Sequence, residues 1–117
     1  MMRLLFTPLF VLLLALPAQA QTQLELNQQA DADFKKADKQ LNAKYQKLMK
    51  QLDATGKKKL VAAELAWIKF RDLQAEVEMD WYRGGSLGLL MYAQCKERLT
   101  KARIKDLELS LDVREDR

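Results

Sequence analysis

The segment at residues 81–86 carries the residue types best suited to contacting another molecule. It consists of two aromatic residues, an arginine, two glycines and a serine: Trp81, Tyr82, Arg83, Gly84, Gly85 and Ser86. Glycines let a partner approach the backbone closely, and an aromatic beside a cation offers both apolar and charged contact. The same composition also makes a capped turn between two helices. Two interpretations therefore stand side by side, a partner-binding loop and a plain connection.

Catalytic chemistry has little support in the sequence. The chain contains no histidine, which removes histidine acid–base chemistry and the commonest zinc ligand. No nucleophile–base pair, metal-ligand cluster or glycine-rich phosphate loop stands out, and the carboxylates fall on faces expected to be solvated. We therefore expect a binding protein with no catalytic residues, no metal and no cofactor.

Charged residues inside the chain are expected to be mainly structural. Arg71-Asp72 lies mid-helix beside aromatic residues, and we expect an ion pair there that locks the second helix to the third, with Arg103 doing the same work from the third. The basic run 57–59 is either an anion-attracting patch or, as we favour, a solvated turn, because cations are unfavourable at a helix start. The single cysteine, Cys95, falls on an apolar helical face and is expected to be a core residue rather than a reactive or bridging thiol.

The first twenty residues predict a secretory signal peptide. Met1-Met2-Arg3 is a short basic start, residues 4–16 are mostly apolar, and Ala18-Gln19-Ala20 matches the small-residue cleavage pattern. The apolar run is shorter than the ~20 residues that span a bilayer, so a membrane anchor is disfavoured. Cleavage after Ala20 leaves a domain at 21–117 that is periplasmic or secreted, without a membrane-spanning segment.

The predicted mature domain is mildly basic. Removing Arg3 lowers the formal charge from +4 to +3. Export makes nucleic acid an improbable partner, so the expected partners are proteins or anionic components of the cell envelope.

Helical periodicity predicts an all-α fold, a small three-helix antiparallel bundle with helices at about 26–53, 58–82 and 87–111. Gly56 is expected to close the first helix in the left-handed conformation, and Ser86 to cap the third. Trp81 and Tyr82 are adjacent, so they cannot both face the core. The expected core stripes are Phe34, Ala37, Leu41, Tyr45, Leu48 and Leu52 on the first helix; Leu60, Ala63, Trp67, Phe70, Gln74, Val77 and Trp81 on the second; and Met91, Cys95, Leu99, Ala102 and Leu109 on the third.

The end of the third helix is apolar on a second side as well. Ile104, Leu107 and Leu111 lie roughly opposite its main stripe. They make either a docking or dimer surface or, as we slightly favour, a face covered by the start of the first helix.

Five segments, in order and at their spacings, resemble the LprI-type exported domain, a family named after a lysozyme inhibitor. They are L-N-A-K-Y at 41–45, A-E-L-A-W-I-K-F-R-D at 63–72, Y-R-G-G-S at 82–86, Y-A-Q-C at 92–95 and L-T-K-A-R at 99–103. The resemblance covers roughly residues 30–107. It implies a small helical exported fold and suggests lysozyme inhibition. The chain departs from the family in lacking a second cysteine that would bridge the one resembling Cys95, since Ala75 stands at that position.

The resemblance leads to one functional hypothesis and an alternative. Lysozyme cleaves with two carboxylates in a cleft, and the turn carrying Arg83 could enter that cleft and pair with one of them. Animal lysozymes are strongly basic, and a basic chain would meet them slowly. The alternative is a structural or interaction module of the cell envelope with an unidentified partner, docking through the second apolar side of the third helix.

Overall fold

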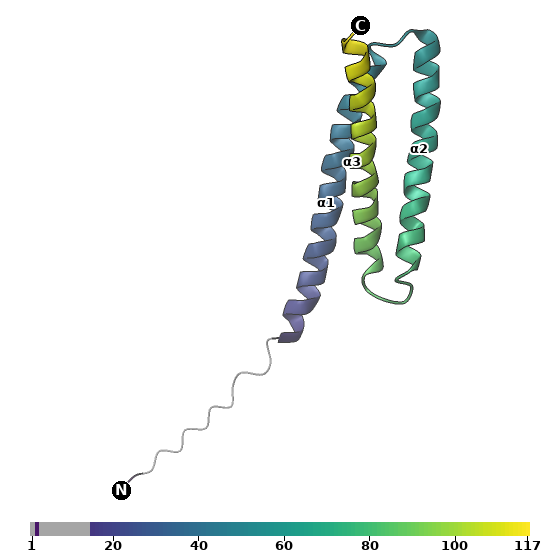
Figure 1. The fold of residues 1–117 in the computed structure, drawn as a ribbon. Helices are drawn as coiled ribbons and strands as arrows, with labels where there is room; N and C mark the ends of the chain where they lie inside the picture. The colour runs from purple at the N-terminus through teal and green to yellow at the C-terminus, as the bar shows by residue number, and fades with distance from the viewer. Residues whose placement is uncertain (1, 3–14) are drawn as a thin grey trace.

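The computed structural model describes Met2 and residues 15–117, and the described part folds into three α-helices. These are α1 (Ala15–Met49), α2 (Ala54–Asp80) and α3 (Gly88–Glu115) (Figure 1). The predicted all-α class is confirmed. Most of the predicted signal peptide, residues 1 and 3–14, lies outside the described residues. Among the helices that are described, none combines the length and apolarity needed to cross a membrane.

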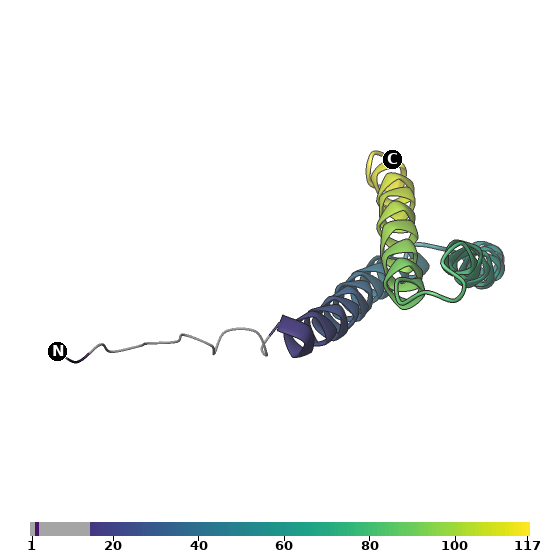
Figure 2. The ribbon, with the colours of Figure 1, turned by 90° about the horizontal axis from the view of Figure 1, so that it is seen from below.

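α3 occupies the middle of the molecule. It packs along α1 on one side and along α2 on the other, and α2 runs antiparallel to both (Figures 1 and 2). The expectation that short links make each helix the neighbour of the next holds for α2 and α3. It fails for α1, whose main partner is α3, because the largest apolar side chains of α1 match those of α3.

α1 begins at Ala15, well before the predicted start near residue 26. The segment in between is rich in alanine, glutamine and leucine, which favour helix, and it contains no glycine. Pro17 is tolerated because it falls in the first turn, where the backbone N–H has no helical partner. Ala30 is the first side chain of α1 described as buried. Cleavage after Ala20 would therefore shorten α1 without removing any described core side chain.

The two connections differ from the predicted caps. Asp53 caps α2, and its Oδ1 accepts a hydrogen bond from the Gly56 backbone N–H at 2.8 Å, so Gly56 belongs to the first turn of α2 and not to a left-handed closure of α1. Between α2 and α3, Gly84 adopts a φ of +81°, as expected for a glycine in such a turn. Ser86 does not cap α3, since Leu87 occupies that position without a side-chain hydrogen bond.

The core lies between α1 and α3. Leu41 and Leu48 of α1 pack with Leu107 and Leu111 of α3, and the predicted stripe of α1 is the buried one. Leu107 and Leu111 are only 2% and 3% exposed, so the interpretation of this face as a docking surface is wrong. It is covered by the second half of α1, because that is where the leucine stripe of α1 lies.

The predicted core stripe of α2 is largely wrong. Phe70, Val77 and Trp81 are 54%, 52% and 82% exposed, whereas Glu64, Arg71 and Ala75 are buried. The helix is rotated about its axis because charged side chains on its inner face find partners on the other two helices. The apolar pattern of α2 therefore predicted burial of the face that the structure leaves exposed.

Candidate functional site: the α2–α3 turn

The turn at residues 81–86 closes through successive backbone hydrogen bonds. The N–H of Tyr82 donates to the carbonyl of Met79, that of Arg83 to Asp80, and that of Gly85 to Tyr82, all at 3.0–3.1 Å. These bonds extend α2 into a tight turn, and the positive φ of Gly84 reverses the chain toward α3. The backbone of the candidate loop is therefore fixed before any partner arrives.

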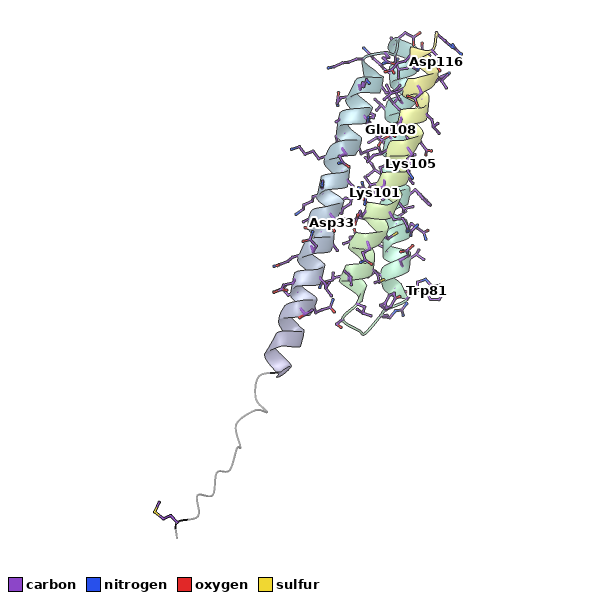
Figure 3. All side chains as sticks on the ribbon, turned by 60° about the vertical axis from the view of Figure 1, so that its left-hand side comes forward. Asp33, Trp81, Lys101, Lys105, Glu108 and Asp116 are labelled. Atoms are coloured by element: carbon purple, nitrogen blue, oxygen red, sulfur yellow. The ribbon has the colours of Figure 1, made fainter. Side chains whose placement is uncertain are left out.

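The side chains of this turn point into solvent. Trp81 lies at the end of the helical hairpin, on the outer side of the helices (Figure 3), and is 82% exposed. Tyr82 is also exposed, so both adjacent aromatics lie outside the core, where one had been expected to face inward. A large aromatic held on a rigid turn in water is typical of the anchor residues of protein interfaces.

Arg83 is already paired. Its guanidinium donates to both carboxylate oxygens of Asp80, with N–O distances of 2.7–2.9 Å. Because both side chains are more than half exposed, water screens the pair and a partner can compete with it. Arg83 is thus a held and partly neutralised cation.

An open depression of about 460 Å³ lies beside the turn. Carboxylates of α2, a guanidinium and glycines line it: Glu76, Met79, Asp80, Tyr82, Arg83, Gly84, Gly85, Gly88 and Leu89. Gly88 packs closely there: a Cβ at this position would lie 3.2 Å from Cγ of Met79, whose side chain would have to shift by a few tenths of an ångström. A depression of this kind suits a protruding side chain of a protein partner.

The charge of α2 is divided along its length. Residues 57–71 carry five cationic side chains and one carboxylate, a formal charge of +4. Residues 72–95 carry four carboxylates and one guanidinium, a formal charge of −3. The turn therefore sits at an acidic end of a protein whose net charge is basic. The lysines at 57–59 are exposed at the opposite end.

Arg71 joins α2 to α1. Its guanidinium bonds Asp72 at 2.9 Å and Asp38 of α1 at 3.3 Å, and it stacks on the rings of Phe34 and Trp67 at 5.0 and 5.1 Å. The expected ion pair with Asp72 is present, but the helix that Arg71 contacts is α1 and not α3. The stacking explains why a cation can be 7% exposed here, since the aromatic faces replace part of its hydration.

Arg103 joins α3 to α2. Its Nε and Nη2 both donate to Oε2 of Glu64, at 3.1 and 3.0 Å, and its guanidinium lies 5.8 Å from the centre of the Trp67 ring. Trp67 is thus flanked by two arginines and packs against the core leucines. Glu64 was not predicted. Its spacing of seven residues before Arg71, which puts both on one helix face, was the signal available in the sequence.

Cys95 is 1% exposed, as predicted for a core residue. Burial first, then a side-chain hydrogen bond with Glu78, raises the pKa of its thiol to about 11. A thiol in this state is a weak nucleophile, because the thiolate is the reactive form. Across the described residues, no group of three or more histidine, cysteine or carboxylate side chains is placed to hold a metal ion.

Comparison with known proteins gives a consistent result. The chain matches the family described as "Lysozyme inhibitor LprI" over residues 16–107. It is 31% identical over 111 residues to the uncharacterized protein R02472 of Rhizobium meliloti (strain 1021), covering 84% of this chain and 80% of that protein. No solved structure shows significant similarity. The chain belongs to the LprI lysozyme inhibitor family.

Proposed function

We propose that this protein is exported and inhibits a lysozyme-type muramidase by binding it, without catalysing a reaction. Membership of a family described as lysozyme inhibitors supports this activity. The observation that carries the proposal is the exposed Trp81 on a rigid turn at the acidic end of α2. We call residues 81–86, with the adjoining carboxylates Glu76 and Asp80, the tip surface.

The charge division of α2 removes the electrostatic objection to a basic target. A net charge of +3 on the mature chain would repel a basic lysozyme at long range, but over a Debye length of about 8 Å the partner responds mainly to the nearest charges. Residues 72–95, which include the tip surface, have a formal charge of −3, and two of their carboxylates, Asp72 and Glu78, pair with Arg71 and Arg98 outside that range. A basic enzyme is therefore attracted to this end of the molecule and repelled by the other, which orients the encounter.

Trp81 is the proposed anchor, in place of Arg83. An exposed tryptophan can bury a large apolar area in a cleft with little loss of side-chain freedom. Arg83 would first have to exchange the carboxylate of Asp80 for one of the enzyme, so its net contribution is smaller.

The test is a lysis assay. The exported, processed protein is titrated against lysozyme acting on bacterial cell-wall suspensions at low and high salt. We expect stoichiometric loss of lysis that weakens at high salt, because salt screens the steering charges. Trp81→Ala should weaken inhibition at least tenfold, whereas Leu109→Ala, a matched exposed apolar residue on α3, should leave it unchanged. Full lysis at a large excess of the wild-type protein would remove lysozyme as the target.

The envelope-module alternative keeps less support. Its docking face, built on Leu107 and Leu111, is inside the core. Only the exposed lysines at 57–59 remain as an anion-facing feature.

A further inference from the structure

The outer face of α2 carries an apolar stripe that no described residue covers. Leu73 on this stripe is 50% exposed, and its neighbours Phe70, Val77 and Trp81 are at least as exposed. The face that α2 buries runs through Glu64, Arg71 and Ala75, about a third of a turn or more away. The stripe repeats at steps of three and four, as in a coiled-coil seam. We name it the outer stripe: Ala63, Ala66, Phe70, Leu73, Val77 and Trp81.

Two unpaired charges border this stripe on the same side. Lys69 and Glu76 are seven residues apart and both are exposed. Neither makes an ion pair within the described part of the chain. If Phe70 and Val77 occupy the first position of a coiled-coil heptad, Lys69 and Glu76 occupy the last position. In an antiparallel pair, the last position of one helix faces the last position of the other.

We propose that the outer stripe binds the α2 of a second copy of this chain in antiparallel orientation. The two-fold axis then passes between Phe70 and Leu73, so that each Phe70 packs on Leu73 of the second copy. Ala66 faces Val77, and the small residues near Ala63 receive Trp81. Large side chains thus lie opposite small ones, as interdigitating packing requires.

Charge selects a second copy as the occupant and fixes the direction. Antiparallel pairing places residues 57–71 of one α2, with a formal charge of +4, beside residues 72–80 of the other, with a formal charge of −4. It also brings each Lys69 next to Glu76 of the second copy. Parallel pairing would instead align like charges over the whole helix, which is destabilising. The outer stripe is therefore complementary to itself in one orientation.

The size of the stripe limits the affinity. Residues 63–81 span about 27 Å of helix, and a single pair of helices over that length buries less than the roughly 800 Å² per partner of a standard interface. The dimer is weak. Its dissociation constant is micromolar or higher, so its binding free energy is no more favourable than about −8 kcal/mol.

Sedimentation equilibrium of the exported protein from about 1 µM to about 1 mM tests the pairing. We expect a monomer–dimer equilibrium. Lys69→Glu and Glu76→Lys should each weaken the dimer about tenfold, because each brings like charges together twice. Lys105→Glu and Asp106→Lys on α3, both exposed and without ion pairs, are the controls and should have no effect.

Mixing the two variants separates this geometry from a general charge effect. A Lys69→Glu chain paired with a Glu76→Lys chain has attractive contacts at both sites, so the mixture should form heterodimers as tightly as the wild type. The double variant K69E/E76K should regain homodimers for the same reason. A wild-type monomer at about 1 mM, or a mixture that stays monomeric, would overturn the proposal. Circular dichroism confirms that each variant remains helical.

Discussion

The pair formed by Glu64 and Arg103 should control the stability of the α2–α3 hairpin. Replacing Glu64 by Leu removes both hydrogen bonds from the Arg103 guanidinium. The Arg103 side chain is 17% exposed and that of Glu64 is 10% exposed, so neither can rehydrate fully when its partner is lost. Breaking a fully buried pair costs about 3–5 kcal/mol. With this residual exposure, we expect Glu64→Leu to lower the free energy of unfolding by about 2–4 kcal/mol.

Removing both charges should cost much less. In Glu64→Leu/Arg103→Met no charge is left unpaired, and both new side chains pack beside Trp67. The double variant should lie within about 1 kcal/mol of the wild type. With a cost for Arg103→Met similar to that of Glu64→Leu, the coupling energy is then about 3 kcal/mol or more.

Urea unfolding and thermal melts, both followed by circular dichroism, give the free energy of unfolding and the Tm of all four proteins of the cycle. For a chain of this length, each kcal/mol corresponds to about 4–8 °C in Tm, so the single variants should melt at least ~10 °C lower. If the single effects simply add in the double variant, the pair is not coupled and the reasoning from burial is wrong.

Three further predictions concern the hairpin. The pKa of Cys95 is raised from 9.0 to about 11, so the neutral thiol's contribution to the stability of the fold is complete below pH 9 and is lost as pH rises through 11. Alkylation of Cys95 at pH 9 should therefore be slow until denaturant is added. Ala75→Cys should form a disulfide with Cys95, since both positions are buried on neighbouring helices and the family resemblance pairs them, and oxidation should stabilise the fold by about 3 kcal/mol. Free thiols that can still be detected after oxidation would contradict this. Gly84→Ala should destabilise by about 1–2 kcal/mol through its φ of +81°, although no atom lies within 4 Å of the added Cβ, whereas Gly85→Ala should be nearly neutral in thermal melts.

The sequence predicted the buried stripe of α1 well, because its leucines recur at regular helical spacing. It predicted the wrong face for much of α3: Ala102 and Leu109 of the expected stripe are exposed, whereas Leu107 and Leu111, which were placed opposite that stripe, pack on the leucines of α1. α2 could not be oriented in this way. Its inner face is mixed, with Glu64 and Arg71 among small and aromatic residues, and its outer face is the more apolar. What decides the rotation is the position of Asp38 and Arg103 on other helices, and a single helix pattern contains no information about such distant partners.

The turn between α2 and α3 lies where the sequence predicted it, and its role in binding stays a prediction. The turn at 81–86 and the glycine at its reversal follow from local composition. The pairing of Arg83 with Asp80 could also have been read from their spacing of three residues, which are neighbours on a helix. The depression beside the turn could not have been predicted from the sequence, because it combines side chains from both helices and the turn.

The order of charges along α2 works against the helix that carries them. Apart from the Asp53 cap, its first turns contain lysines and no acidic residue, and its last turn has no basic residue, so these charges add to the partial charge of the backbone dipole at each end. Cations at the start and carboxylates at the end each typically destabilise an exposed helix by about 0.3–1 kcal/mol. α2 is therefore a helix under electrostatic frustration, and salt should stabilise it while weakening what it binds. Departures from helix-favouring charge order of this kind are expected where a surface is shaped by its contacts.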